Sequence, residues 1–173
     1  MKRRLAFLAA VSALAGASAP LPAATPEVQV KAAYLFKLAA FVRWPDPAQE
    51  AFRICVAGRA DIASSLSALT KGQQVDGKSV AVVQLAPAQA QDASRCQVLF
   101  VGRGADTARA MLKASAGNPV LTVTDRNGGT RGGVIEFMVA GGKVRLSIDR
   151  SEASAHKLEL SSKLMDVAAE VRP

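Results

Sequence analysis

The sequence predicts a single α/β domain whose mixed sheet has about six strands, a parallel core plus a C-terminal antiparallel hairpin, flanked by helices. Four short apolar runs alternate with helical segments, and continuous Val/Ile/Leu runs are typical of parallel strands covered on both faces. Two later runs flank Ala140-Gly141-Gly142, a hairpin signal that adds an antiparallel pair at one side. The chain has 173 residues, 50% of them hydrophobic, enough for one domain and its core.

The first element is a helix over residues 26–43, because apolar residues recur at helical spacing and Glu27 lies in its first turn. Trp44-Pro45 ends it. The elements that follow are a strand at 52–57, a helix at 60–69, strands at 80–85 and 96–101, a helix at 105–114, a strand at 120–123, hairpin strands at 134–139 and 143–148, and one or two closing helices from Arg150.

The N-terminus predicts a secretory signal peptide over residues 1–24. Three basic residues precede an apolar run over residues 5–14, and small residues of the A-x-A type follow. Cleavage is expected after Ala17, Ala19 or Ala24. Since no later segment approaches membrane-spanning length, we expect an exported periplasmic protein, not itself membrane-spanning, whose domain covers residues 25–173.

The formal charge is +8, and removal of residues 1–24 leaves 19 basic against 14 acidic residues, a net charge of +5. The basic residues are scattered singly, and only 5% of residues are aromatic. A nucleic-acid-binding protein needs a basic stripe or a recognition helix, so we expect no nucleic-acid partner.

Cys55 and Cys96 are the two cysteines. In an exported protein such a pair predicts a structural disulfide, although two free buried thiols or a redox-switched bridge remain alternatives. Redox catalysis would need C-x-x-C. Zinc would need four ligands, and His156 is the only histidine, so we expect no metal.

Two loops contain residue patterns similar to those of ligand-binding sites. The glycine loop at 102–107 lacks the third glycine of a dinucleotide fingerprint, and the segment from Asp125 to Glu136 fails the calcium-loop pattern at its fifth and sixth positions. There is also no nucleophile elbow and no paired carboxylate motif. We therefore expect no catalytic residues, no cofactor and no enzymatic activity. A small-ligand pocket at the strand ends near Gly58, Gly102 and Asp125 remains a hypothesis.

The first helix is apolar on most of its surface. Tyr34, Phe36 and Phe41 are therefore candidates for a surface that binds a partner or a second copy of the chain, because aromatic residues dominate interface energetics. The alternative is that all three lie in the core.

Several stretches, taken together in order, resemble the YfiR family over residues 28–169. The opening helix, from Lys31-Ala-Ala-Tyr34-Leu-Phe36 to Trp44-Pro45, is similar to that of the family, as are both cysteine-bearing segments and the ending Leu158-x-Leu-Ser-Ser-Lys-Leu164. The stretches at 119–125, 132–135 and 144–148 follow in family order. Gln97 and Met165 depart from the usual His and Leu.

The resemblance implies a periplasmic repressor that binds the periplasmic sensor region of an inner-membrane diguanylate cyclase of the YfiN type and limits cyclic-di-GMP signalling and biofilm formation. It also implies a homodimer. A second cysteine pair found in some members is absent here. The alternative function is a periplasmic small-molecule-binding sensor that acts on a different membrane partner.

Overall fold

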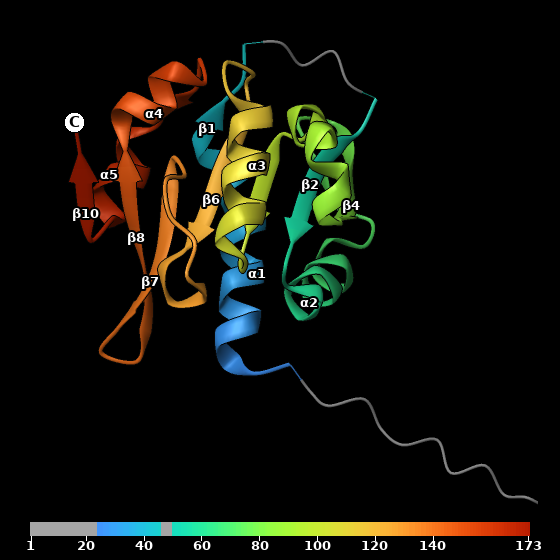
Figure 1. Cartoon of the computed structure of the whole chain (residues 1–173), viewed down its shortest axis with the longest axis horizontal. Helices are drawn as coiled ribbons and strands as arrows, with labels where there is room; N and C mark the ends of the chain where they lie inside the picture. Colours follow the sequence, from blue (N-terminus) through green and yellow to red (C-terminus); the bar gives the residue numbers. More distant parts are fainter. Residues whose placement is uncertain (1–23, 46–49) are drawn as a thin grey trace, which may run out of the picture.

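The computed structural model describes residues 24–45 and 50–173, so the expected signal peptide lies, apart from Ala24, outside the described residues. Its main sheet has eight strands in the order β10-β8-β7-β6-β5-β2-β4-β3 (Figure 1). These are β2 (Phe52–Ala57), β3 (Gln74–Val75), β4 (Lys78–Leu85), β5 (Val98–Val101), β6 (Leu121–Asp125), β7 (Ile135–Ala140), β8 (Lys143–Asp149) and β10 (Glu170–Arg172). A second sheet pairs β1 (Val42–Arg43) with β9 (Glu159–Leu160).

Five helices and three 3₁₀ segments complete this part of the chain. They are α1 (Pro26–Leu38), η1 (Ala39–Phe41), α2 (Ala60–Thr70), η2 (Pro87–Arg95), α3 (Ala105–Ser115), η3 (Arg126–Gly128), α4 (Arg150–Ala155) and α5 (Ser162–Val167). Within the described residues, none of the helices has the length and hydropathy needed to cross a membrane.

The sheet has the predicted parallel core. β4, β2, β5, β6 and β7 run parallel, and β8 pairs antiparallel with β7 through the predicted hairpin, in which Ala140 lies opposite Lys143. Gly141 and Gly142 have φ values of 57° and 70°, the left-handed conformation that a two-residue type I′ turn requires. The predicted fold class is therefore confirmed. β3 and β10, with two and three residues, are too short to show a hydrophobic period.

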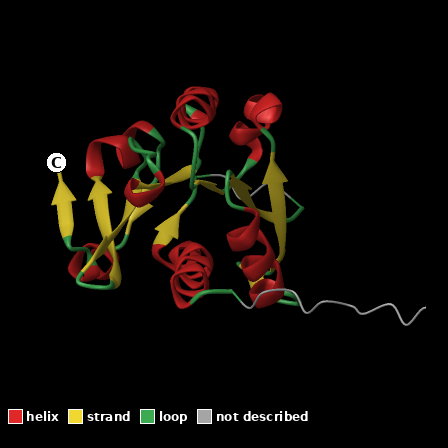
Figure 2. Ribbon diagram, turned by 60° about the horizontal axis from the view of Figure 1, so that its bottom comes forward, coloured by secondary structure: helices red, strands yellow, loops and turns green. Residues whose placement is uncertain are grey.

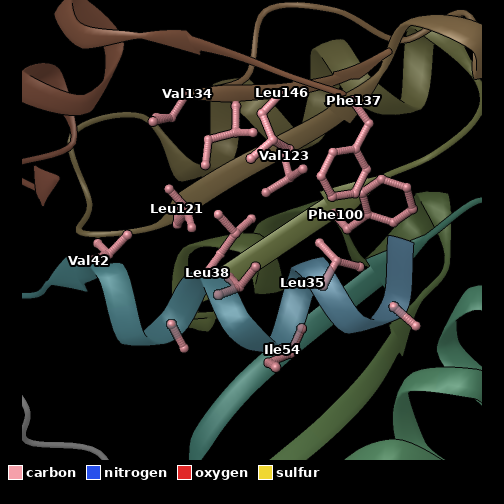
Figure 3. Packing of buried hydrophobic residues seen from close by; sticks show 14 of the residues in the cluster. Leu35, Leu38, Val42, Ile54, Phe100, Leu121, Val123, Val134, Phe137 and Leu146 are labelled. Atoms are coloured by element: carbon pink, nitrogen blue, oxygen red, sulfur yellow. The ribbon is translucent and has the colours of Figure 1, made fainter. Parts of the chain in front are cut away.

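Helices cover both faces of the sheet (Figure 2). On one face, Leu35 and Leu38 of α1 are buried in a cluster with Phe100, Leu121 and other strand residues (Figure 3), and α2 adds Ile62 and Leu66. On the other face, α3 and η2 cover a smaller cluster that includes both cysteines. The strands are thus apolar on both sides, which explains their unbroken hydrophobic runs.

The expected helix over residues 26–43 ends earlier than predicted, at Leu38, and its last residues form η1 and then β1. Pro45 disfavours helical backbone at Trp44. β1 pairs with β9, and the Ser161 N–H donates to the Phe41 carbonyl at 2.9 Å, so tertiary pairing replaces helical hydrogen bonds. After α4, the predicted closing helices are likewise interrupted by β9 and β10.

The predicted disulfide joins Cys55 of β2 to Cys96, two residues before β5, with a Cα–Cα distance of 5.9 Å. Both cysteines are buried, and among the described residues none is a free thiol. The bridge links the two strands at the centre of the sheet. Next to it, the Arg53 N–H donates to Oε1 of Gln97 at 2.7 Å, and the Gln97 N–H donates to the Arg53 carbonyl at 2.9 Å.

Replacing Cys55 with Ser should lower the melting temperature in oxidising buffer, because a bridge closing 41 residues stabilises by about 3–4 kcal/mol in the chain-entropy model. The variant and the wild type should melt close together in dithiothreitol. Calorimetry of both proteins in both buffers checks this. A wild-type melting temperature that reduction leaves unchanged would contradict it.

Candidate functional site

The ends of three parallel strands meet at the carboxyl edge of the sheet, and they bring together Gly58, Gly102 and Asp125, the residues of the hypothesised pocket. A Cβ at Gly58, whose φ is 73°, would lie 2.7 Å from the Arg103 carbonyl oxygen. A Cβ at Gly102 would lie 2.4 Å from Cγ of Arg59. The loops therefore pack directly on one another, and the Arg59 side chain occupies the space above Gly102.

Beside these glycines lies a group of four charged residues, here called the buried ion cluster: Glu27, Lys31, Arg59 and Asp125. The side chains of Lys31 and Asp125 are both fully buried, and Lys31 Nζ lies 2.6 Å from Asp125 Oδ2. Lys31 also binds Glu27 Oε1 at 2.6 Å, and Arg59 NH1 lies 3.7 Å from Asp125 Oδ2. The Asp125 carboxylate is thus already paired with basic side chains. The cavity of about 680 Å³ found elsewhere in the molecule is lined by other residues and not by Gly58, Gly102 or Asp125.

The sequence patterns gave no functional role to Lys31 and did not predict this cluster. The spacing of Glu27 and Lys31, one helical turn apart, is a signal for their ion pair. Asp125 lies 94 residues from Lys31, and no local pattern connects them.

A second charged group ties β10 to the sheet, and its centre is the buried Glu136. Arg126 Nε donates to Glu136, and the Gly132 N–H donates to its Oε1 at 2.8 Å. Glu170 of β10 accepts from Ser147 Oγ at 2.9 Å and from Arg126 at 3.2 Å. Burial by itself would raise the pKa of Glu136, but the Gly132 N–H and the Arg126 guanidinium together lower it below 4.5.

These contacts explain the acidic residues of the segment from Asp125 to Glu136, which partly matches a calcium loop. Asp125 is paired with the side chain of Lys31, and Glu136 with that of Arg126. Within residues 24–45 and 50–173, no group of three or more His, Cys, Asp or Glu side chains could hold a metal ion. His156 is buried, and its Nδ1 lies 2.8 Å from the Asn118 carbonyl oxygen.

The three aromatic candidates on the first helical segment are all half-buried, so each reaches both core and surface. The Tyr34 ring packs against the Phe137 ring, with the two ring centroids 6.0 Å apart. Phe36 and Phe41 instead line an open groove of about 450 Å³ between the end of α1 and β3, called the aromatic groove, whose other lining residues are Lys37, Ala40, Gln74, Val75 and Asp76. The structure therefore places Tyr34 apart from the other two.

The aromatic groove continues into the second, larger cavity of about 680 Å³, since Ala40, Phe41 and Asp76 line both. This larger part ends at β1 and β9, where Arg43 and Glu159 form an exposed ion pair of 3.6 Å. Trp44 also lines it, packs edge-on against Phe52 at 5.2 Å, and has a buried Nε1 without a hydrogen-bond partner. The continuous surface combines apolar lining residues, such as Phe36, Phe41 and Leu160, with charged residues of both signs, Lys37, Arg43, Asp76 and Glu159.

A family model described as YfiR/HmsC-like matches residues 28–169, from α1 to the residue before β10. No curated protein matches the sequence. Among solved structures, the crystal structure of a conserved domain protein from Vibrio cholerae O1 biovar El Tor strain N16961 is similar in fold, with a TM-score of 0.53 and 12% identity. The match covers 84% of this chain and 60% of the Vibrio chain, so this chain spans less than two thirds of that protein.

Replacing Lys31 with Met should reduce the free energy of unfolding by about 3–5 kcal/mol, because the buried Asp125 carboxylate loses its closest cation. Adding Asp125→Asn should recover part of this loss, since it removes the unpaired charge. Urea denaturation of the single and the double variant tests the energetic coupling between Lys31 and Asp125, with Lys113→Met on the exposed side of α3 as the control. Strictly additive losses would contradict it.

Replacing Glu136 with Gln should destabilise the protein by about 1–3 kcal/mol at neutral pH, because the partners of a buried carboxylate are left unsatisfied. The pKa of Glu136 is lowered in the folded state. The stabilisation that its carboxylate provides is therefore complete above pH 4.5 and is lost as the pH falls through the pKa of the folded state. The difference in the free energy of unfolding between the wild type and Glu136→Gln should therefore become smaller in acid. Urea denaturation from pH 7 downward measures it, with the exposed Glu159→Gln as control, and a constant gap would refute the assignment.

Proposed function

The chain belongs to the YfiR/HmsC-like family, and we propose that it is a periplasmic regulator that binds and represses the periplasmic sensor region of an inner-membrane diguanylate cyclase. The family is associated with periplasmic regulation of such cyclases. In this proposal the protein lowers cyclic-di-GMP output by protein binding alone. Neither a catalytic residue nor a cofactor takes part.

The disulfide supports export. Disulfides persist in oxidising compartments such as the periplasm, and they are rare where glutathione and thioredoxin keep thiols reduced. The bridge between Cys55 and Cys96 lies in the core between central strands, where it stabilises the folded domain. This agrees with the signal peptide that the first 24 residues predict.

The aromatic groove carries the proposed contact with the cyclase. Phe36 and Phe41 present ring surface to an open groove, and half-buried aromatic rings surrounded by a polar rim are the usual anchors of protein interfaces. Lys37, Asp76 and the Arg43–Glu159 pair supply charges of both signs at the rim. Such charges select an orientation for the partner segment more than they add affinity.

The alternative function, a small-molecule sensor, has less support. It needs space at the strand ends near Gly58, Gly102 and Asp125, and there the Arg59 side chain and the buried ion cluster fill the volume between the loops. A ligand at this place would have to displace the Lys31–Asp125 ion pair.

Deleting the gene in the source bacterium should raise cellular cyclic-di-GMP, and complementation with the gene that encodes the signal peptide should reverse the rise. Phe41→Ser should fail to complement, because loss of an interface anchor costs about 2 kcal/mol or more, roughly a 30-fold loss of affinity. Val167→Ser, at a side chain that is 67% exposed on α5, is the matched control and should complement fully.

Periplasmic levels of both variants are measured by immunoblot, and their folding is checked by circular dichroism. Unchanged cyclic-di-GMP on deletion, across several growth conditions, would overturn the proposed function. Full complementation by a Phe41→Ser protein would leave repression standing but would exclude the aromatic groove as the contact surface.

A further inference from the structure

The strand β10 forms one outer edge of the main sheet, where it runs parallel to β8. Its three residues lie opposite residues 147–149 of β8. Only one of the three, Val171, is apolar, and its side chain is 42% exposed. Apolar burial therefore contributes little to the attachment of β10. β10 also lies outside residues 28–169, the segment that the family model matches.

At this edge the sheet offers a place for one carboxylate. Glu170 Oε2 accepts a hydrogen bond from Ser147 Oγ at 2.9 Å and another from the Arg126 guanidinium at 3.2 Å. Arg126 is held in this position by the buried Glu136, to which its Nε donates. Because a hydroxyl and a guanidinium both donate hydrogen bonds, this place selects an acidic side chain.

Two residues further along β10, the sheet offers a place for a basic side chain. Arg172 NH2 lies 3.5 Å from Asp149 Oδ2 and 3.9 Å from Glu136 Oε1. Both distances exceed those of a charge-assisted hydrogen bond. Among the described residues, the buried Nε of Arg172 has no hydrogen-bond partner, and an unsatisfied buried donor costs free energy. β10 is therefore an imperfect occupant of this edge, and a segment that fits better can displace it.

β10 also leaves part of β8 uncovered, because it pairs with three of the seven β8 residues. The Leu146 carbonyl accepts the Ala169 N–H at 2.8 Å, so the backbone groups of Leu146 point outward. Since backbone directions alternate along a strand, those of Val144 also point outward. No strand in the described part of the chain pairs with residues 143–145 on this side, and the β7–β8 hairpin continues past β10 (Figure 1). A longer strand could thus form more backbone hydrogen bonds with β8 than β10 does.

The uncovered part of β8 carries two exposed basic residues, Lys143 and Arg145. They share one face of the sheet with Ser147 and Asp149, because side chains two residues apart on a strand point to the same side. Acidic side chains are favoured directly opposite basic ones. The charges along β8 therefore match an extended segment with acidic side chains at three alternate positions, followed two residues later by a basic side chain.

We propose that the outer edge of β8 is a binding site for such a segment of a different protein, which adds to the sheet as a parallel strand and displaces β10. Its acidic side chains lie opposite Lys143, Arg145 and Ser147, and its basic side chain lies opposite Asp149. β10 is an internal competitor that keeps this edge closed until the segment is present. The site shares no residue with the aromatic groove and does not depend on a cyclase.

The proposal is tested on the purified mature protein by fluorescence anisotropy with the labelled peptide Glu-Val-Glu-Val-Glu-Val-Arg, which the wild type should bind. Arg145→Glu places a carboxylate opposite a carboxylate and should weaken this binding about tenfold. Lys113→Glu, the same change of charge at an exposed residue of α3, should leave the binding unchanged. Hydrogen exchange followed by NMR should show that the peptide protects the Val144 amide.

A double variant tests the competition by β10. Glu170→Lys combined with Arg172→Glu places like charges beside Arg126 and Asp149, so β10 should detach and the peptide should bind about tenfold more tightly than it binds the wild type. Circular dichroism checks that the double variant is folded. Arg145 lies outside β10, so its variant tests the site independently of this one.

Three results would overturn the binding site. They are no binding of the peptide to the wild type or to the double variant, binding that Arg145→Glu leaves unchanged, and equal binding of the charge-reversed peptide Lys-Val-Lys-Val-Lys-Val-Glu. A folded double variant that binds the peptide no more tightly than the wild type would overturn the role of β10 as a competitor.

Discussion

The ion pair between Lys31 and Asp125 determines where the first helix sits on the sheet. Both side chains are fully buried, so neither charge can be satisfied by water, and α1 can pack only in the register that brings them together. That register directs Leu35 and Leu38 into the core and leaves Phe36 and Phe41 at the surface. The aromatic groove is thus set by a contact some distance away from it along the helix, and a shift of α1 would rearrange the groove as well as the core.

The two faces of the sheet are stabilised by different means. The face under α1 and α2 holds the larger apolar cluster, with Phe100 and Phe137 packed at a centroid distance of 5.7 Å. The opposite face, under α3 and η2, has smaller side chains, among them several alanines, and contains the disulfide. A cluster with little apolar area gains less from burial, so a covalent link between its central strands compensates for the weaker packing.

The sequence predicts the parts of this fold that depend on long local patterns. The six predicted strands are all present, and so are the helices at 60–69 and 105–114, because each strand is long enough to show a continuous apolar run and each helix long enough to show a helical hydrophobic period. β1, β3, β9 and β10 have two or three residues, and their pairing is decided by distant segments. For the same reason the pairing of Lys31 with Asp125 and of Arg126 with Glu170 could not be foreseen. Gly58 and Gly102 directly follow β2 and β5, but their role in close loop packing depends on the Arg59 and Arg103 atoms that would meet a Cβ at these positions, and no local pattern shows this.

The disulfide also makes part of the chain a covalently closed ring. The segment between Cys55 and Cys96 contains α2, β3, β4 and all of η2. A periplasmic protease that cuts one exposed loop inside this ring, such as the turn at Gly72, leaves two chain segments that stay linked until the bridge is reduced. After a cut C-terminal to Cys96, no covalent bond links the C-terminal fragment to the rest of the chain. A single cut is therefore tolerated without loss of covalent continuity only within the ring, whose cysteines are 41 positions apart in the chain of 173 residues.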